Sequence, residues 1–254
     1  IRKEQEYKKA VINIISEILP TPSISELSER CLSNTSIRTK LKDIFQTLDI
    51  DSKFLEKAYS HPSLAITMIG TYKQKSFDKK MFCDYLDDII DDDNRKKVKG
   101  KIDTFEYSSL LTLNLQHASV ETPLYAGFER FIVMTTPNIR HFKELCLSSL
   151  KYSDDFDKES IEYESVSDIK PISELGMHLG VISTSSDLLK EIVSYPPHGR
   201  RLSQMVNRIG ELFKLSQNSS YQTEPERVIF TIDYDFSGSD LEIESLIDSA
   251  ICWR

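Results

Sequence analysis

Glycine and proline are scarce in this sequence, with 8 and 9 among 254 residues. This composition excludes a collagen-like chain and argues against an all-β chain rich in loops. No apolar run approaches the roughly 18 residues that a membrane-spanning helix needs, so we expect no membrane partner. The sequence begins at Ile1-Arg2-Lys3-Glu4 without an initiator methionine or a signal-peptide pattern, which favours an internal start.

The motifs of several common chemistries are also absent. The five histidines follow neither HxxxH nor HExxH spacing, so we predict no zinc site. There is no GxSxG, and no GxxxxGK[ST] loop to cradle the phosphates of ATP. We therefore expect this chain alone to bind no metal and no ATP. The cysteines are far apart without a CxxC pair, which is typical of reduced thiols in a cytoplasmic protein: Cys31, Cys83, Cys146 and Cys252.

Acidic residues outnumber basic ones and give a net charge of −8. This charge argues against a chain covered by nucleic acid, although it leaves room for a small basic patch. A run of carboxylates spaced near one helical turn has the ligand type that Mg²⁺ or Ca²⁺ prefers, but it lacks a histidine and the glycine of an EF-hand. We interpret this run as a solvent-exposed helix face: Asp84, Asp87, Asp88, Asp91, Asp92 and Asp93. The basic run that follows, Arg95 to Lys101, is expected to form a loop.

Apolar residues recur with the period of an amphipathic helix through most of the chain. Such helices are predicted over 2–19, 25–32, 36–48, 51–59, from Pro62 onward, within 76–93 and over 105–115. The polar, acidic segment that begins near Ser153 predicts a linker.

Residues 125–150 predict two helices that meet at a sharp corner. Thr136 followed by Pro137 is a start signal, in which a hydroxyl caps the second helix and proline takes its first position. Arg140 then lies in the first turn, where the helix dipole favours an anion, so a neighbouring phosphate would make this cation favourable. The alternative is a surface ion pair with Glu144 or Glu129, contributing less than about 1 kcal/mol.

The last third of the chain predicts helices starting at Ser186 or Asp187, at His198 and at Ser239 or Asp240, with a strand over 228–234. This order is compatible with a winged-helix-like module that ends before it is complete. In such a module the exposed side of the helix from His198 would meet DNA phosphates. The candidate contacts are Arg200, Arg201 and Arg208, and the alternative is an ordinary solvated helix face.

Three short stretches carry a resemblance: Tyr125-Ala126-Gly127-Phe128, Asn138-Ile139-Arg140-His141-Phe142 and Glu144-Leu145-Cys146. Together they resemble the lid subdomain of the bacterial AAA+ ATPases related to the initiator proteins of origin-recognition complexes. In that family a similar pattern opens the helix that bears the sensor-2 arginine. The resemblance therefore implies that Arg140, with Asn138, senses nucleotide. Glu224-Pro225-Glu226 and the segment from Leu246 to Trp253 resemble the region that follows the lid.

The sequence thus predicts a mainly α protein with a helical AAA+ lid-like domain (1–152), an acidic linker (153–170) and a truncated winged-helix-like α+β module (171–254). The resemblance implies that the intact, oligomeric protein binds ATP and Mg²⁺ in a core that this chain lacks. The implied partners are that N-terminal ATPase core or neighbouring subunits, and DNA. Whether the chain has enzymatic activity is left open, since the intact protein would be the ATPase. The alternative is a helical scaffold that binds protein partners and never meets ATP.

Overall fold

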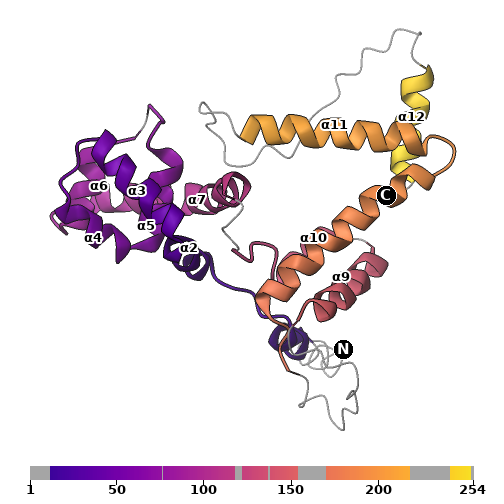
Figure 1. Cartoon of the computed structure of the whole chain (residues 1–254), viewed down its shortest axis with the longest axis horizontal. Helices are drawn as coiled ribbons and strands as arrows, with labels where there is room; N and C mark the ends of the chain where they lie inside the picture. Colours follow the sequence, from indigo (N-terminus) through magenta and orange to yellow (C-terminus); the bar gives the residue numbers. More distant parts are fainter. Residues whose placement is uncertain are drawn as a thin grey trace. The chain divides into compact units, whose positions relative to one another are not determined.

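The structure is a computed structural model of the chain, and it describes residues 12–75, 77–117, 122–136, 138–153, 170–217 and 241–252. These residues form helices and their connections, with no strand among them, which confirms a mainly α fold (Figure 1). No helix in this part of the chain is long and apolar enough to cross a membrane. The chain divides into two compact units, residues 1–182 and 183–254. The predicted linker lies almost wholly at 154–169, outside the described residues, so the predicted domain bounds stay a prediction.

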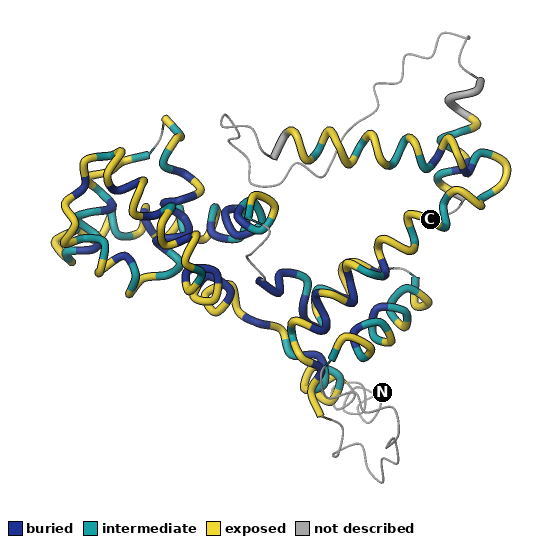
Figure 2. Tube along the Cα trace, in the orientation of Figure 1, coloured by how far each residue is buried: buried dark blue, intermediate teal, exposed yellow. Residues whose placement is uncertain are grey.

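The first half of unit 1 is a helical cluster built around one apolar helix. Every residue of α5 from Leu64 to Ile69 is buried, and Figure 2 shows the same concentration of buried residues. α7 packs closely on α5, because a Cβ on Gly70 would lie only 2.6 Å from the Ser109 Cβ. The helices of this cluster are α2 (Ile24–Ser33), α3 (Thr35–Thr47), α4 (Lys53–Tyr59), α5 (Pro62–Thr71), α6 (Lys79–Leu86) and α7 (Asp92–Gln116).

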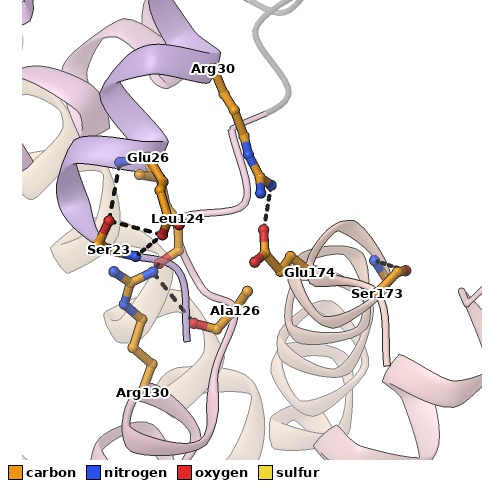
Figure 3. Close-up of polar contacts among 9 residues, drawn as sticks. Ser23, Glu26, Arg30, Leu124, Ala126, Arg130, Ser173 and Glu174 are labelled. Carbon is orange, nitrogen blue, oxygen red and sulfur yellow. Dashed lines mark hydrogen bonds and ion pairs between the residues drawn. The ribbon is translucent and has the colours of Figure 1, made fainter. Parts of the chain in front are cut away.

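Side-chain caps define where these helices begin. The Ser23 hydroxyl accepts a hydrogen bond from the Glu26 amide at 3.2 Å, and the Glu26 carboxylate accepts one from the Ser23 amide at 2.7 Å (Figure 3). This reciprocal arrangement is a capping box, which satisfies two backbone donors that the helix leaves open. The Ser23 amide and the Ser23 hydroxyl both donate to the Glu26 carboxylate, and these hydrogen bonds hold the pKa of Glu26 below its ordinary value. Asn34 caps α3 and Asp78 caps α6, each by a side-chain oxygen that accepts a hydrogen bond from one backbone amide of the first turn.

The basic run from Arg95 to Lys101 is helical, so its prediction as a loop is wrong. Asp91 caps α7 by accepting from the Asn94 amide at 2.8 Å, and acidic residues fill the first turn, where the helix dipole favours them. The run of carboxylates is likewise not one helix face. The backbone leaves the helical conformation at Asp88, which has a φ of 58°. Asp88 forms an ion pair with Arg95 at 2.5 Å, and Asp87 forms one with Lys57 at 2.5 Å.

The second half of unit 1 is a smaller cluster. It contains the helical residues 12–18, α8 (Phe128–Thr135), α9 (Ile139–Lys151) and the first half of α10 (Glu174–Glu191). α9 and α10 cross at close range, because a Cβ on Gly180 would lie 2.6 Å from the Ser149 backbone nitrogen. The buried apolar side chains of this cluster are Leu19, Ala126, Phe131, Leu145, Ile172, Met177 and Val181.

Several contacts join the two clusters of unit 1. Tyr125 packs against both of them. Arg30 of α2 forms an ion pair with Glu174 at the start of α10, and Arg130 of α8 donates to the Leu124 carbonyl at 2.6 Å (Figure 3). The hydrogen bond from Arg130 thus ties Leu124, which lies shortly before α8, to that helix.

Unit 2 contains the end of α10, the short 3-10 helix η2 (Ile192–Ser194), α11 (Gly199–Gln217) and α12 (Leu241–Cys252). α10 is one helix from Glu174, so the predicted start at Ser186 or Asp187 is wrong. α11 and α12 agree with the predicted helices. The predicted strand over 228–234 lies outside the described residues, and the winged-helix-like module therefore stays a prediction.

Candidate functional site

The corner between α8 and α9 positions the residues that the resemblance singles out. The Asn138 side chain accepts a hydrogen bond from the Arg140 amide at 3.0 Å and caps α9. The prediction that Thr136 caps this helix is wrong, because Thr136 instead ends α8 and donates to the Ile132 carbonyl at 2.6 Å. The amide of Asn138 thus supplies the cap two residues later, and Arg140 still falls in the first turn, as predicted.

The Arg140 side chain is 67% exposed and forms an ion pair with Glu144, with 2.7 Å between Nε and Oε1. This is one of the two ion pairs that the sequence offers as alternatives to nucleotide contact. The pair joins residues four apart on one helix, an arrangement that contributes only a few tenths of a kcal/mol when exposed. Asn138 lies 3.4 Å from the His141 ring through its amide nitrogen, so both of its polar atoms have partners within α9.

Large apolar side chains are exposed on the two helices of the corner. On the inner side, Phe142 of α9 packs edge-on against Phe128 and Phe131 of α8. On the outer side, Val133 is 79% exposed and Ile139, next to Arg140, is 68% exposed. Large apolar side chains that are exposed close together are a feature by which interaction surfaces are recognised. We name this set the corner apolar residues: Ile132, Val133, Met134, Ile139 and Leu147.

The three arginines proposed for DNA contact are all exposed on α11. Arg201 and Arg208 are seven residues apart, which places them on nearly the same side of the helix and about 10 Å apart along its axis. Arg200 lies about a quarter turn away. Arg208 pairs weakly with Glu211, at 3.5 Å between Nη1 and Oε2. The structure therefore brings the three together on one exposed helix.

The described residues contain no group of three or more histidine, cysteine or carboxylate side chains placed to hold a metal ion. Cys31, Cys83 and Cys146 are free thiols. Burial raises the pKa of Cys31 and of Cys146 to about 11, so both stay protonated and are poor nucleophiles and metal ligands at neutral pH.

A family model described as ORC-CDC6-like matches residues 1–254. The chain belongs to the ORC-CDC6-like family. No curated protein and no solved structure matches it significantly. Membership in the ORC-CDC6-like family supports the initiator-like AAA+ character that the resemblance implies, and it does not favour the scaffold alternative.

In this ORC-CDC6-like chain, sequence reasoning missed the corner apolar residues. A signal for them was present, because Ile132, Val133 and Met134 are consecutive. One helix face can bury at most two neighbouring positions of such a run, so at least one had to face outward.

Proposed function

We propose that this chain is the lid and the DNA- or partner-binding portion of an initiator-like AAA+ ATPase. In this proposal ATP and Mg²⁺ are held by a core outside residues 1–254, either on the same protein or on a neighbouring subunit. The support is the family match over the full length of a sequence that contains no GxxxxGK[ST] loop. The described residues offer a single arginine at the α8–α9 corner and no phosphate cradle there, which suits a lid that reports nucleotide.

The observation that carries the proposal is the position of Arg140. It stands exposed in the first turn of α9, where the backbone amides and helix dipole favour an anion. Its ion pair with Glu144 is weak enough to be exchanged for the stronger charge-assisted hydrogen bonds that a γ-phosphate accepts. Ile139 beside it, and Val133 on α8, are exposed apolar side chains that would lose contact with water if a core docked over them, which would favour the closed state.

The test is ATP hydrolysis by the complete protein. A charge-assisted hydrogen bond contributes about 1.5–3 kcal/mol, so Arg140→Ala should lower the turnover roughly 10- to 150-fold. Its melting temperature without nucleotide should stay near that of the wild type, because the ion pair with Glu144 is exposed and contributes little to stability. Arg140→Lys should restore activity in part, since a point charge lacks the planar fork of guanidinium.

Two control variants separate this role from surface chemistry. Glu144→Gln removes the ion pair but keeps Arg140, and it should retain wild-type turnover. Lys143→Ala removes another exposed cation from the same helix and should also be silent. Normal hydrolysis by Arg140→Ala would leave the Glu144 ion pair as the whole role of this arginine, and the scaffold alternative would return.

A further inference from the structure

Three helices of unit 1 bring basic side chains together in a place that no part of the proposed function uses. Lys40 belongs to α3, Lys73 follows the end of α5, and His117 is the C-cap of α7. The Lys40 Nζ lies 2.9 Å from the Gln116 side-chain oxygen and 3.5 Å from the His117 Nε2. Residues far apart in the sequence thus meet in one cluster, which we name the Lys40 cluster: Lys40, Lys73, Gln116 and His117.

The charges of the two lysines in the Lys40 cluster repel one another, and they disfavour protonation of His117. Burial and the nearby charge of Lys73 lower the pKa of Lys40. Burial and the charge of Lys40 lower the pKa of His117 in turn. Among the described residues, no carboxylate forms an ion pair with Lys40, Lys73 or His117. Lys40 is half-buried and Lys73 is exposed. A half-buried cation without an anion is unfavourable, and a bound anion would relieve the repulsion between the two lysines.

The position of one of these cations, Lys40, has a simpler explanation, because its ammonium group lies at the C-terminal end of α7. The carbonyl groups at the C-terminus of α7 carry partial negative charge and favour a cation such as Lys40. That effect stabilises one charge at one helix end, and it does not call for three basic groups in the same place. The Gln116 side chain adds an amide that donates as well as accepts, so the cluster offers donors of several kinds.

We propose that the Lys40 cluster binds a phosphate group. The two lysines supply compact point charges of the kind that bind phosphate, and the Gln116 amide supplies a neutral donor. In the free protein Lys40 donates to the His117 Nε2, so this nitrogen carries a lone pair. A bound dianion favours protonation of His117, which then becomes a further donor. The charged group that acts on His117 is Lys40 of α3. The charged group that acts on Lys40 is Lys73, which follows the C-terminal end of α5.

The first experiment titrates the chain with inorganic phosphate and follows the His117 ring by NMR, with sodium chloride at matched ionic strength as reference. Binding should shift the His117 resonances and raise its pKa. Lys73→Gln, at an exposed position after α5, should weaken phosphate binding roughly tenfold, as expected for one lost charge-assisted contact. Lys40→Met should weaken it at least as much. Lys99→Gln, an exposed lysine on α7, is the matched control and should bind like the wild type.

The fold of Lys40→Met is checked by comparing its melting temperature with that of the wild type. The proposal is overturned if chloride reproduces the shifts of His117, or if Lys73→Gln binds phosphate as tightly as Lys99→Gln. Two further ligands identify the source of the phosphate. Tighter binding of a ten-nucleotide single strand than of a nucleoside monophosphate assigns the cluster to a nucleic-acid backbone. Equal binding of the two assigns it to a free nucleotide.

Discussion

At the scale of single residues, two glycines show how differently the same residue type is used. A Cβ on Gly180 would lie 2.6 Å from the Ser149 nitrogen and 2.7 Å from its Cα, so the clash is with backbone that cannot rotate away. Gly210 of α11 has nothing within 4 Å of such an atom. The first glycine is therefore required by the crossing of α9 and α10, whereas the second is not required by packing.

This difference leads to a paired prediction. Gly180→Ala should lower the free energy of unfolding by about 1–3 kcal/mol, the usual effect of overpacking a close contact. Gly210→Ala should leave it unchanged or raise it by up to about 1 kcal/mol, because alanine is the better helix former. Urea denaturation of the two variants measures both effects. A Gly180→Ala protein as stable as the wild type would show that the helices can separate without loss.

His178 gives unit 1 a predicted sensitivity to acid. It is buried in α10, its ring stacks on Tyr125 with 5.2 Å between centres, and burial lowers its pKa from 6.5. Below pH 6.5 the unfolded chain therefore binds a proton that the folded chain does not. Stability should consequently fall as the pH falls through this range and should be fully present above it.

The variant His178→Phe keeps a ring beside Tyr125 but cannot titrate. Its free energy of unfolding should depend less on pH between 7 and 5 than that of the wild type, as measured by urea denaturation at each pH. The same pH dependence in both proteins would assign the acid sensitivity to another group, such as His117, whose pKa is also lowered.

At the scale of helices, the sequence predicts a helix well where its start signal and the period of its apolar residues indicate the same segment. α2, α3 and α11 lie within a few residues of their predicted bounds, and α5 begins at Pro62, the residue predicted to start it. The start of α10 was missed because Gly176 and Gly180 weaken the helical pattern, by roughly 1 kcal/mol each relative to alanine. In the structure both glycines are buried, and Gly180 permits close packing on α9, so tertiary contact outweighs local propensity.

In the basic segment of α7, by contrast, local propensity itself favours the helix that the structure shows. A run of basic residues predicts a loop, although lysine and arginine are good helix formers and Asp91 caps the helix that contains them. At the candidate site, the position of Arg140 in a first turn follows from local pattern, and so does its pairing with Glu144. The position of the Lys40 cluster does not, because Lys40, Lys73 and the Gln116–His117 pair are more than thirty residues apart in the sequence and only the packing of α3, α5 and α7 brings them together.

The exposed arginines of α11 predict DNA binding that depends on salt. If Arg200, Arg201 and Arg208 each neutralise one phosphate, replacing all three by glutamine should reduce the log–log slope of affinity against salt by about 2.7. The matched control replaces Arg95, Lys96 and Lys99 of α7 by glutamine, which changes the net charge equally. A similar loss in both triple variants would indicate a general effect of charge rather than contact through α11.

At the scale of the whole molecule, the described residues of the two units differ in how much apolar surface they bury. Unit 1 contains two clusters joined by Tyr125 and by the Arg30–Glu174 ion pair, and we expect it to unfold as one body. Among the described residues of unit 2, Leu202 is the one buried apolar side chain larger than alanine. Since burial of apolar surface is the main stabilising contribution, unit 2 should open at a lower free energy than unit 1.

This difference predicts two separable openings in hydrogen exchange followed by peptide. Amides of α11 should exchange faster than those of α5, whose residues from Leu64 to Ile69 are all buried. Gly199→Ala places a Cβ 2.4 Å from the Val193 carbonyl oxygen, so it should accelerate exchange in α11 and leave α5 unchanged. Gly180→Ala should accelerate exchange in α5 and leave α11 unchanged, because the clash of its Cβ with Ser149 lies within unit 1. If either substitution accelerates exchange equally in α5 and α11, the two units unfold as a single cooperative body, and local stability is not divided at residue 182.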